Sequence, residues 1–387
     1  MHIIKKSAIL AAAIFIIYSC KKEDTKANNQ EELCAVQRSV RDGSIIEGQY
    51  IVAYRPNDGG LTSSQRSTQI SKDVLSRNQI SASAMKQSFA GEHPGFVAIL
   101  TTTEADKLRN DPVIEAIEPD RIIALSTCFT IVAPTLVTWN INKVGYGDGT
   151  GKTAWIIDSG IDFDHPDLNV DVARSKSFLS GNTSADDENG HGTHVAGIIG
   201  AKNNNFGVLG VASGANLVSL RVLDKDGNGT LSSIVQALAY VNANGKAGDV
   251  VNMSIGEDKV SDILDQQVQA TASRGIFISI AAGNDAKSAD LYSPGRANGN
   301  NIYTVSAVDS LDNFASFSNF GNDVVDYAAP GVRILSTYKD GQYAKMSGTS
   351  MAAPHVAGLL LINGGKLHSS AIAKNDPDGS PDPIAFK

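Results

Sequence analysis

Three segments of the chain carry side chains that could together perform nucleophilic catalysis. Ser350 follows a Gly-Thr pair and precedes a run of small residues, so we expect it to lie at the start of a helix. The first N–H groups of a helix are unpaired and its dipole is positive at that end, so an oxyanion beside Ser350 would be stabilised. His191 opens a second helix-like run, and Asp158 ends an apolar run. These side chains permit a relay in which the histidine takes the serine proton and the aspartate fixes the histidine tautomer.

Each of these residues also has a structural interpretation when it is taken alone. A serine at the start of a helix is most often an N-cap, and an aspartate after a strand often forms a turn. Residue type and spacing do not choose between His191 and His194, or between Asp158 and Asp162. The serine lacks the G-x-S-x-G sequence and the Ser, Asp, His order of lipases and esterases. We therefore do not expect an esterase fold.

Taken together, the three segments resemble a known family. AWIIDSGID at 154–162, HGTHVAGIIG at 191–200 and GTSMAAPHVAG at 348–358 are similar, in this order, to the signature segments of the subtilisin-like serine proteases, the subtilases. The resemblance covers roughly residues 130–363. It implies a serine endopeptidase that needs no cofactor for its chemistry. The implied catalytic triad is Asp158, His191 and Ser350.

The same resemblance implies where the oxyanion and the polypeptide substrate bind. IAAGND at 280–285 is similar to the oxyanion-hole segment, in which Asn284 would donate alongside the backbone N–H of Ser350. The implied walls of the primary specificity pocket are Ser254, Ile255, Gly256, Ala281, Ala282 and Gly283. The implied opposite edge of the cleft contains Gly227 and Gly229. An extended polypeptide would add as a strand between these edges. Because the walls carry no charge, we expect an apolar or aromatic side chain before the scissile bond.

The pattern of apolar segments predicts an α/β fold with a parallel sheet and helices on both faces. The strand-like runs lie at 153–158, 216–223, 249–255, 275–281 and 301–308, and the helical stretches between them at 231–242 and about 260–274. In such sheets ligands bind at the carboxyl ends of the strands. Asp158, Ser254 and Asn284 all follow strand-like runs, which is consistent with one site.

Residues 47–125 predict a separate small domain. Strand-like segments at 48–54, 84–89, 95–100 and 113–120 and two helical segments, the second capped by Thr101, give the order β-α-β-β-α-β. This is the ferredoxin-like α+β arrangement, and it resembles the inhibitor propeptide that precedes subtilase catalytic domains. The resemblance implies a zymogen whose own propeptide is an intramolecular inhibitor, with its tail across the active site. We expect self-cleavage within roughly 122–134, after Leu125 or Phe129.

The first twenty residues indicate export. Lys5 and Lys6 precede an apolar stretch at 8–18, which is too short to span a bilayer but suits a signal peptide. The stretch ends at Cys20 and resembles a bacterial lipoprotein signal, so the protein would be a membrane-anchored lipoprotein; simple secretion is the alternative. The formal charge of -8 argues against a nucleic-acid partner. The rival function is an inactive protease-fold surface lipoprotein that acts as a binding module, and the intact catalytic segments disfavour it.

Other features carry weaker expectations. Asp167 and Asn204, with carbonyls at 202, 206 and 208, resemble the family's calcium site, although Thr135 stands where the family has an amide ligand. The acidic run 186–188 is expected to be a solvated loop. Cys34 and Cys128 could pair after export. The chain then divides into a signal peptide (1–19), a polar tether (20–46), the inhibitor-type propeptide (47–125), the catalytic domain (126–363) and a polar C-terminal surface tail (364–387).

Overall fold

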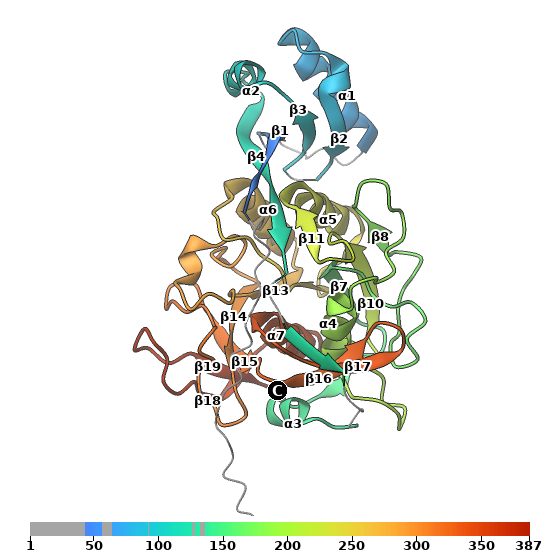
Figure 1. Cartoon of the computed structure of the whole chain (residues 1–387), viewed down its shortest axis with the longest axis vertical. Coiled ribbons are helices and arrows are strands. Elements are labelled where there is room, and N and C mark those ends of the chain that lie inside the picture. Colours follow the sequence, from blue (N-terminus) through green and yellow to red (C-terminus); the bar gives the residue numbers. More distant parts are fainter. Residues whose placement is uncertain (1–42, 56–63, 92, 126–127, 132–135) are drawn as a thin grey trace, which may run out of the picture. The chain divides into compact units, whose positions relative to one another are not determined.

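The computed structural model describes residues 43–55, 64–91, 93–125, 128–131 and 136–387, with the backbone alone at 64, 65, 128–131 and 370 (Figure 1). The signal peptide and residues 20–42 of the predicted tether, with Cys20 and Cys34, lie outside this part of the chain, as do Thr135 and the side chain of Cys128. The last two residues of the predicted tether, Ile45 and Ile46, belong to the first strand of the next domain. Within the described ranges, no helix has the length and apolar character needed to cross a membrane.

The inhibitor-type domain has the predicted order of elements. They are β1 (Ile45–Tyr54), α1 (Ser64–Arg77), the 3-10 turn η1 (Ala82–Ala84), β2 (Met85–Phe89), β3 (Gly95–Ile99), α2 (Thr102–Arg109) and β4 (Ile114–Ala124). The strands pair antiparallel in the order β4-β1-β3-β2, and Val52, Val74, Phe96 and Leu108 lie in one buried cluster. The predicted capping box is present, since Thr101 and Glu104 accept each other's backbone N–H groups. This domain therefore has a core of its own.

The second domain is built on a nine-stranded sheet in the order β18-β19-β15-β14-β13-β12-β7-β10-β8. Its strands are β7 (Thr153–Asp158), β8 (Lys176–Ser177), β10 (Asn216–Arg221), β12 (Val250–Met253), β13 (Phe277–Ala281), β14 (Ile302–Val308), β15 (Tyr327–Pro330), β18 (His368–Ile372) and β19 (Pro383–Phe386). All neighbouring pairs are parallel except β18 and β19. The five strands predicted from the sequence are β7, β10, β12, β13 and β14.

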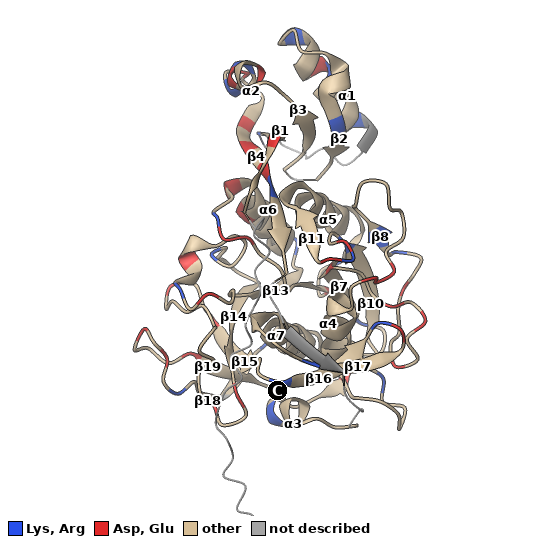
Figure 2. Ribbon diagram, in the orientation of Figure 1, with Lys and Arg blue, Asp and Glu red and all other residues tan. Residues whose placement is uncertain are grey.

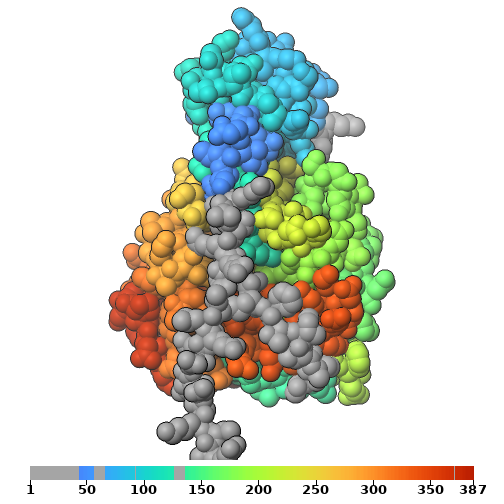
Figure 3. Space-filling model, viewed as in Figure 1, coloured from blue at the N-terminus to red at the C-terminus, as the bar shows by residue number. Residues whose placement is uncertain are grey.

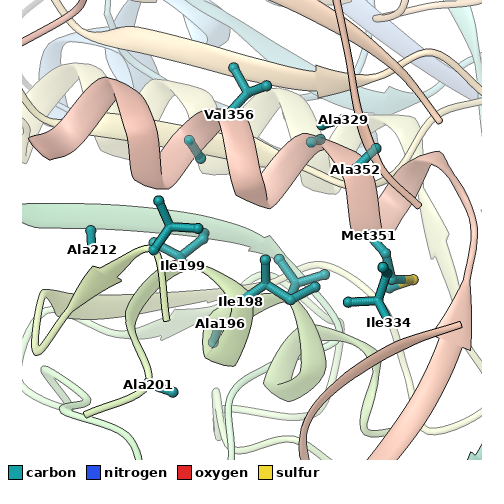
Figure 4. Packing of buried hydrophobic residues seen from close by; sticks show 14 of the residues in the cluster. Ala196, Ile198, Ile199, Ala201, Ala212, Ala329, Ile334, Met351, Ala352 and Val356 are labelled. Atoms are coloured by element: carbon teal, nitrogen blue, oxygen red, sulfur yellow. The ribbon is translucent and has the colours of Figure 1, made fainter. Parts of the chain in front are cut away.

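Helices cover both faces of this sheet. The main helices are α4 (His191–Gly200), α5 (Leu231–Asn244), α6 (Asp262–Ser273) and α7 (Thr349–Asn363). Side chains of β7 alternate, so Ala154 and Ile156 join the cluster around α4 and α7, while Trp155 and Ile157 join the cluster around α5 and α6. Figure 4 shows how α4 and α7 pack together in the first of these clusters. A strand that is buried on both faces reads as a continuous apolar run, which is why β7 could be predicted.

The remaining elements are short, and the sequence analysis did not identify them. They are α3 (Trp139–Val144), the pair β6 (Gly147–Asp148) and β9 (Ala212–Ser213), the 3-10 turn η2 (Ala289–Leu291), the hairpin of β16 (Ile334–Tyr338) and β17 (Gln342–Ser347), and the strands β5 (Cys128–Ile131) and β11 (Asn228–Thr230). β5 pairs with β17, and β11 pairs with β4 of the inhibitor-type domain. These two pairings turn out to border the candidate active site.

The prediction of a polar surface tail at 364–387 was wrong. β18 and β19 lie in this segment, and β19 extends the main sheet by pairing with β15. Ile384 and Ala385 are buried, and the buried Asp382 accepts a hydrogen bond of 2.6 Å from the Ser306 hydroxyl. The few core residues are separated by a turn-rich loop, so no apolar periodicity was visible in the sequence.

Candidate active site

Asp158 and His191 are brought together at the carboxyl end of the sheet. Asp158 ends β7 and His191 begins α4, and His191 Nδ1 lies 2.7 Å from Asp158 Oδ1. Both side chains are almost fully buried, at 0% and 1% exposure. Because a carboxylate only accepts hydrogen bonds, Nδ1 carries the proton in this pair, and Nε2 of a neutral His191 is left as the basic atom. The backbone N–H of Ser159 also donates to Asp158 Oδ1 at 2.7 Å.

The two alternatives that the sequence left open lie elsewhere. Nε2 of His194 lies 3.0 Å from the carbonyl oxygens of both Ile334 and Ala344, and burial lowers the pKa of His194 to about 3. The carboxylate of Asp162 accepts from the backbone N–H of Gly341 at 2.9 Å. The geometry therefore distinguishes His191 and Asp158, where residue spacing could not.

Asp187 accepts hydrogen bonds from residues next to both members of the Asp158–His191 pair, and the sequence analysis missed this role. Its carboxylate accepts from the Ser159 hydroxyl, from the backbone N–H of Gly190, and from the backbone and hydroxyl of Thr193, the last at 2.6 Å. Asp187 is 8% exposed, so the expectation of a solvated acidic loop was wrong for this residue. An acidic residue just ahead of a helix start is the N-terminal signal that could have indicated this role.

Ser350 lies in the first turn of α7, as predicted. The helix follows Gly348, whose φ of 152° favours glycine. The Ser350 hydroxyl donates to the carbonyl oxygen of Ser254 at 3.0 Å, and the Ser254 hydroxyl donates to the carbonyl of Ser350 at 2.7 Å. Within the described chain, His191 Nε2 has no hydrogen-bond partner. For a proton relay, the Ser350 hydroxyl must therefore turn from Ser254 toward His191.

Asn284 is oriented by the residue that precedes Ser350. Its amide oxygen accepts from the backbone N–H of Thr349 at 2.8 Å and from the Thr349 hydroxyl at 3.0 Å. This leaves the NH₂ group of the Asn284 amide as the donor side. Asn284 and Ser350 line the same pocket, so the arrangement is suited to donating hydrogen bonds to an anionic oxygen beside Ser350.

The pocket beside Ser350 contains all six of the predicted wall residues: Ser254, Ile255, Gly256, Ala281, Ala282 and Gly283. Its lining also includes Glu257, Asp258 and Asp285, so the expectation of an uncharged pocket was wrong. Glu257 and Asp258 follow the predicted wall residue Gly256 in the sequence, and Asp285 follows Asn284. The signal was therefore present, in residues directly beside the predicted wall and oxyanion residues.

The inhibitor-type domain enters the cleft along the predicted edge. β4 pairs antiparallel with β11, with Ala124 opposite Asn228, and the N–H of Leu125 donates to the carbonyl of Gly227 at 3.0 Å. Gly227 has a φ of 77°, and a Cβ atom there would lie 3.2 Å from the Leu125 side chain. Gly229 lies opposite Ile123 in the same ladder. The two glycines thus form a strand edge, not a wall of the pocket.

The chain leaves the cleft along β17, an edge that the sequence analysis did not identify. Cys128 lies opposite Ser347 and Phe129 opposite Met346 in the antiparallel pairing of β5 with β17. Ser347 is three residues before Ser350. Residues 122–124 of the chain therefore pair with β11, and residues 128–131 pair with β17.

Glu118 and Asp120 of β4 cap helices of the catalytic domain. Figure 2 colours the acidic positions of β4 red. Glu118 accepts from the Ser261 hydroxyl at 2.6 Å and from the Ile263 N–H at 3.1 Å, at the start of α6. Asp120 accepts from the Ser232 N–H at 3.0 Å, at the start of α5. Atoms of the inhibitor-type domain accordingly adjoin those of the catalytic domain in Figure 3. Both caps therefore lie at helix N-termini, where anionic partners are favoured.

Protein donors occupy the carboxylate of Asp167, one of the residues predicted to bind calcium. Asp167 Oδ1 accepts from the Asn204 amide at 2.9 Å, and Oδ2 accepts from the Val208 N–H at 2.8 Å and the Tyr343 hydroxyl at 3.2 Å. Asn204 thus turns its NH₂ group toward Asp167, whereas calcium requires oxygen ligands. In the described ranges no cluster of three or more His, Cys, Asp or Glu side chains could hold a metal ion.

Comparison with known proteins agrees with this geometry. Residues 149–363 match the model of the Subtilase family. The chain belongs to this family. Residues 49–126 match the model of peptidase inhibitor I9, which confirms the predicted propeptide. This subtilase is therefore a subtilisin-like serine protease with an N-terminal inhibitor domain.

Individual relatives of this subtilase include alkaline proteases. It is 37% identical over 303 residues to a thermostable alkaline protease of Halalkalibacterium halodurans, with 75% of this chain and 79% of that protein covered. It is 37% identical over 336 residues to alkaline serine exoprotease A of Vibrio alginolyticus, covering 83% of this chain and 61% of that protein. A crystal structure of a cold-adapted subtilisin-like serine proteinase is similar at 34% identity and a TM-score of 0.57, over 65% of this chain and 98% of that one. The predicted fold class is confirmed.

Proposed function

We propose that this subtilase is an exported endopeptidase that matures by cutting its own chain. The observation that carries the proposal is the pairing of two nearby segments of the chain. Residues 122–124 pair with β11, and residues 128–131 pair with β17. An extended polypeptide substrate would follow the same path, because both edges offer unpaired backbone groups once the propeptide has left.

The proposed chemistry uses Asp158, His191, Ser350 and Asn284. The Ser350 hydroxyl turns to His191, gives its proton to Nε2, and Oγ attacks the carbonyl carbon of the scissile bond. The negative oxygen that results accepts from the backbone N–H of Ser350 and from the Asn284 amide. His191 then gives the proton to the leaving amine, and water hydrolyses the acyl-enzyme by the same route. Asp158 keeps the imidazole in the required tautomer throughout.

The same path narrows the expected maturation site. Leu125 is still paired with the entry edge and Cys128 is already paired with the exit edge, so the cut bond lies between these two residues. The initial range of 122–134 thus reduces to the bonds of Leu125–Ser126, Ser126–Thr127 and Thr127–Cys128. Phe129 lies on the leaving side, opposite Met346, and does not qualify as the residue before the cut.

Processing of the purified precursor tests the proposal. Ser350→Ala and His191→Ala should accumulate as full-length protein, while the wild type yields a catalytic fragment at a rate independent of enzyme concentration. Ser310→Ala, an exposed serine outside the site, is the matched control and should process normally. Mass spectrometry of the fragments locates the cut. A Ser350→Ala precursor cut at the same bond without added protease would overturn self-processing. Failure of a fluorophosphonate to label the wild type would favour the inactive binding module instead.

Export and anchoring are part of the proposal and rest on the sequence before residue 21. A lipid on Cys20 would hold the precursor at a membrane, since each buried methylene contributes about 0.8 kcal/mol. Cys20→Ser should then lose incorporation of labelled fatty acid and shift to the soluble fraction. If the wild type takes up no fatty acid, simple secretion is the better account.

A further inference from the structure

The specificity pocket of this protease has carboxylates on both of its walls. Glu257 and Asp258 extend the wall that begins at Ser254, and Asp285 extends the wall that ends at Gly283. All three line the same pocket as Ser350. They therefore lie where the side chain before the scissile bond would be received.

Hydrogen bonds hold the backbone of two of these acidic residues, Glu257 and Asp285, in place. The N–H of Glu257 donates to the carbonyl of Ser293 at 3.0 Å, and Glu257 is 1% exposed. The N–H of Asp285 donates to the Asn319 side chain at 2.9 Å. Since Ser293 also lines the pocket, Glu257 belongs to a fixed part of its wall. The positions of Glu257 and Asp285 are thus fixed by the fold of the pocket.

The rest of the lining is apolar and aromatic. Ile255, Ala281, Ala282 and Tyr292 provide surface of the kind that covers a hydrocarbon stem. Lysine and arginine have this composition, an aliphatic stem with a cationic end, and a tyrosine ring also attracts a cation. A purely apolar side chain would displace water from the carboxylates and offer them no hydrogen bond in its place, which is unfavourable.

We infer that the pocket selects lysine or arginine before the scissile bond, through Glu257, Asp258 and Asp285. This inference rests on the proposed function and names its substrate class. Removing one of these charges weakens only the interaction with a cationic side chain, so specificity, and not the reaction chemistry, changes.

The chain's own maturation site is compatible with this preference. The segment from Ile122 to Thr135 contains no lysine or arginine. Its cleavage is intramolecular, and the pairing with β11 and β17 positions the bond without help from the pocket. Substrates in solution lack that assistance, so the pocket decides among them.

The test compares fluorogenic peptides that differ only in the residue before the cut. Lysine and norleucine have similar length and differ in the charge, so the mature enzyme should cleave the lysine peptide at least tenfold more efficiently in kcat/KM. The glutamate peptide should be the poorest substrate, and 1 M NaCl should reduce the lysine-to-norleucine ratio through screening. A ratio at or below one in the wild type would overturn the inference.

Variants connect the preference to the three residues. Asp258→Asn and Asp285→Asn should each lower the lysine-to-norleucine ratio several-fold, and Glu257→Gln should lower it further if the buried variant folds. Asp323→Asn, an exposed aspartate outside the pocket lining, is the matched control and should keep the ratio. An unchanged ratio in both Asp258→Asn and Asp285→Asn would contradict the inference.

The outcomes separate the two proposals. If the enzyme digests casein and reacts with a fluorophosphonate but cuts after apolar residues, only the pocket inference fails. If neither digestion nor labelling occurs, the proposed protease activity fails, and the pocket inference fails with it.

Discussion

Glu118 offers a sharp test of how the propeptide is held. Replacing it by alanine would leave the Ser261 hydroxyl and the Ile263 N–H of α6 without the acceptor that they have in the complex. A buried donor that loses its partner costs about 1–3 kcal/mol, so we expect Glu118→Ala to weaken binding by about 2–3 kcal/mol. That corresponds to a roughly thirty- to hundred-and-fiftyfold increase in Ki.

Glu118→Gln separates hydrogen bonding from charge. Burial raises the pKa of Glu118. The interface therefore stabilises the charged carboxylate less than its hydrogen bonds alone would. Glutamine retains an acceptor for the Ile263 N–H, and the Ser261 hydroxyl can turn to accept from its NH₂ group. We therefore expect Glu118→Gln to raise Ki by less than about fivefold. Because the bound form takes up a proton more readily, wild-type inhibition should also strengthen as the pH falls, and the glutamine variant should lack this dependence.

The assay adds separately produced propeptide, residues 43–125, to mature enzyme and measures Ki from peptide hydrolysis. Glu47→Ala, an exposed residue of β1, is the matched control and should leave Ki unchanged. Circular dichroism of each free propeptide checks that its fold is retained. An increase in Ki of less than threefold for Glu118→Ala would refute the capping argument. An equal increase in Ki for Glu118→Ala and Glu118→Gln would show that the charge of Glu118 is what stabilises the complex.

Asn284→Ala should lower turnover by about a hundred- to a thousandfold, a magnitude established for this donor in subtilisin itself, with little change in KM; equal turnover would exclude Asn284 from the oxyanion hole. Burial raises the pKa of Asp382 to about 7, so the contribution of this residue to stability falls as the pH rises from about 4 to about 7. Asp382→Asn should therefore increase the free energy of unfolding at pH 8 by about 2–4 kcal/mol, and should change it little at pH 4. Chemical denaturation at the two pH values measures the difference. Because protein donors occupy the Asp167 carboxylate, a chelator should not change the melting temperature of the Ser350→Ala precursor. A melting temperature lower by several degrees would show that the Asn204 amide oxygen turns toward Asp167 to hold calcium.

The sequence predicted the elements whose burial is continuous or strictly periodic. β7 is apolar on both faces, and α5 presents one apolar stripe, so each could be placed from its own residues. The two helix starts at His191 and Ser350 were visible because a helix N-terminus favours particular residues next to it. These segments carry most of the candidate site.

The elements that escaped prediction are those whose partners are distant in the chain. β17 and β5 are four to six residues long and form a ladder across more than two hundred residues, and nothing local in either strand indicates that pairing. β19 joins the sheet through a single residue pair, Ala328 with Ile384. The role of Asp187 likewise depends on Ser159 and Thr193 meeting it in space. Tertiary context, and not local propensity, decides each of these cases.

The pairing of the chain with both β11 and β17 bears on whether the cleaved peptide bond can re-form. After the cut, the new carboxyl end would still be paired with β11 and the new amino end with β17, so both ends would remain at high effective concentration and the bond could re-form. Hydrolysis becomes irreversible only when one end departs. The four residues of β5 have the weaker attachment, because β4 is also secured by the helix caps of Glu118 and Asp120. Departure of the amino end would thus commit the molecule to maturation, while the inhibitor domain is still in place.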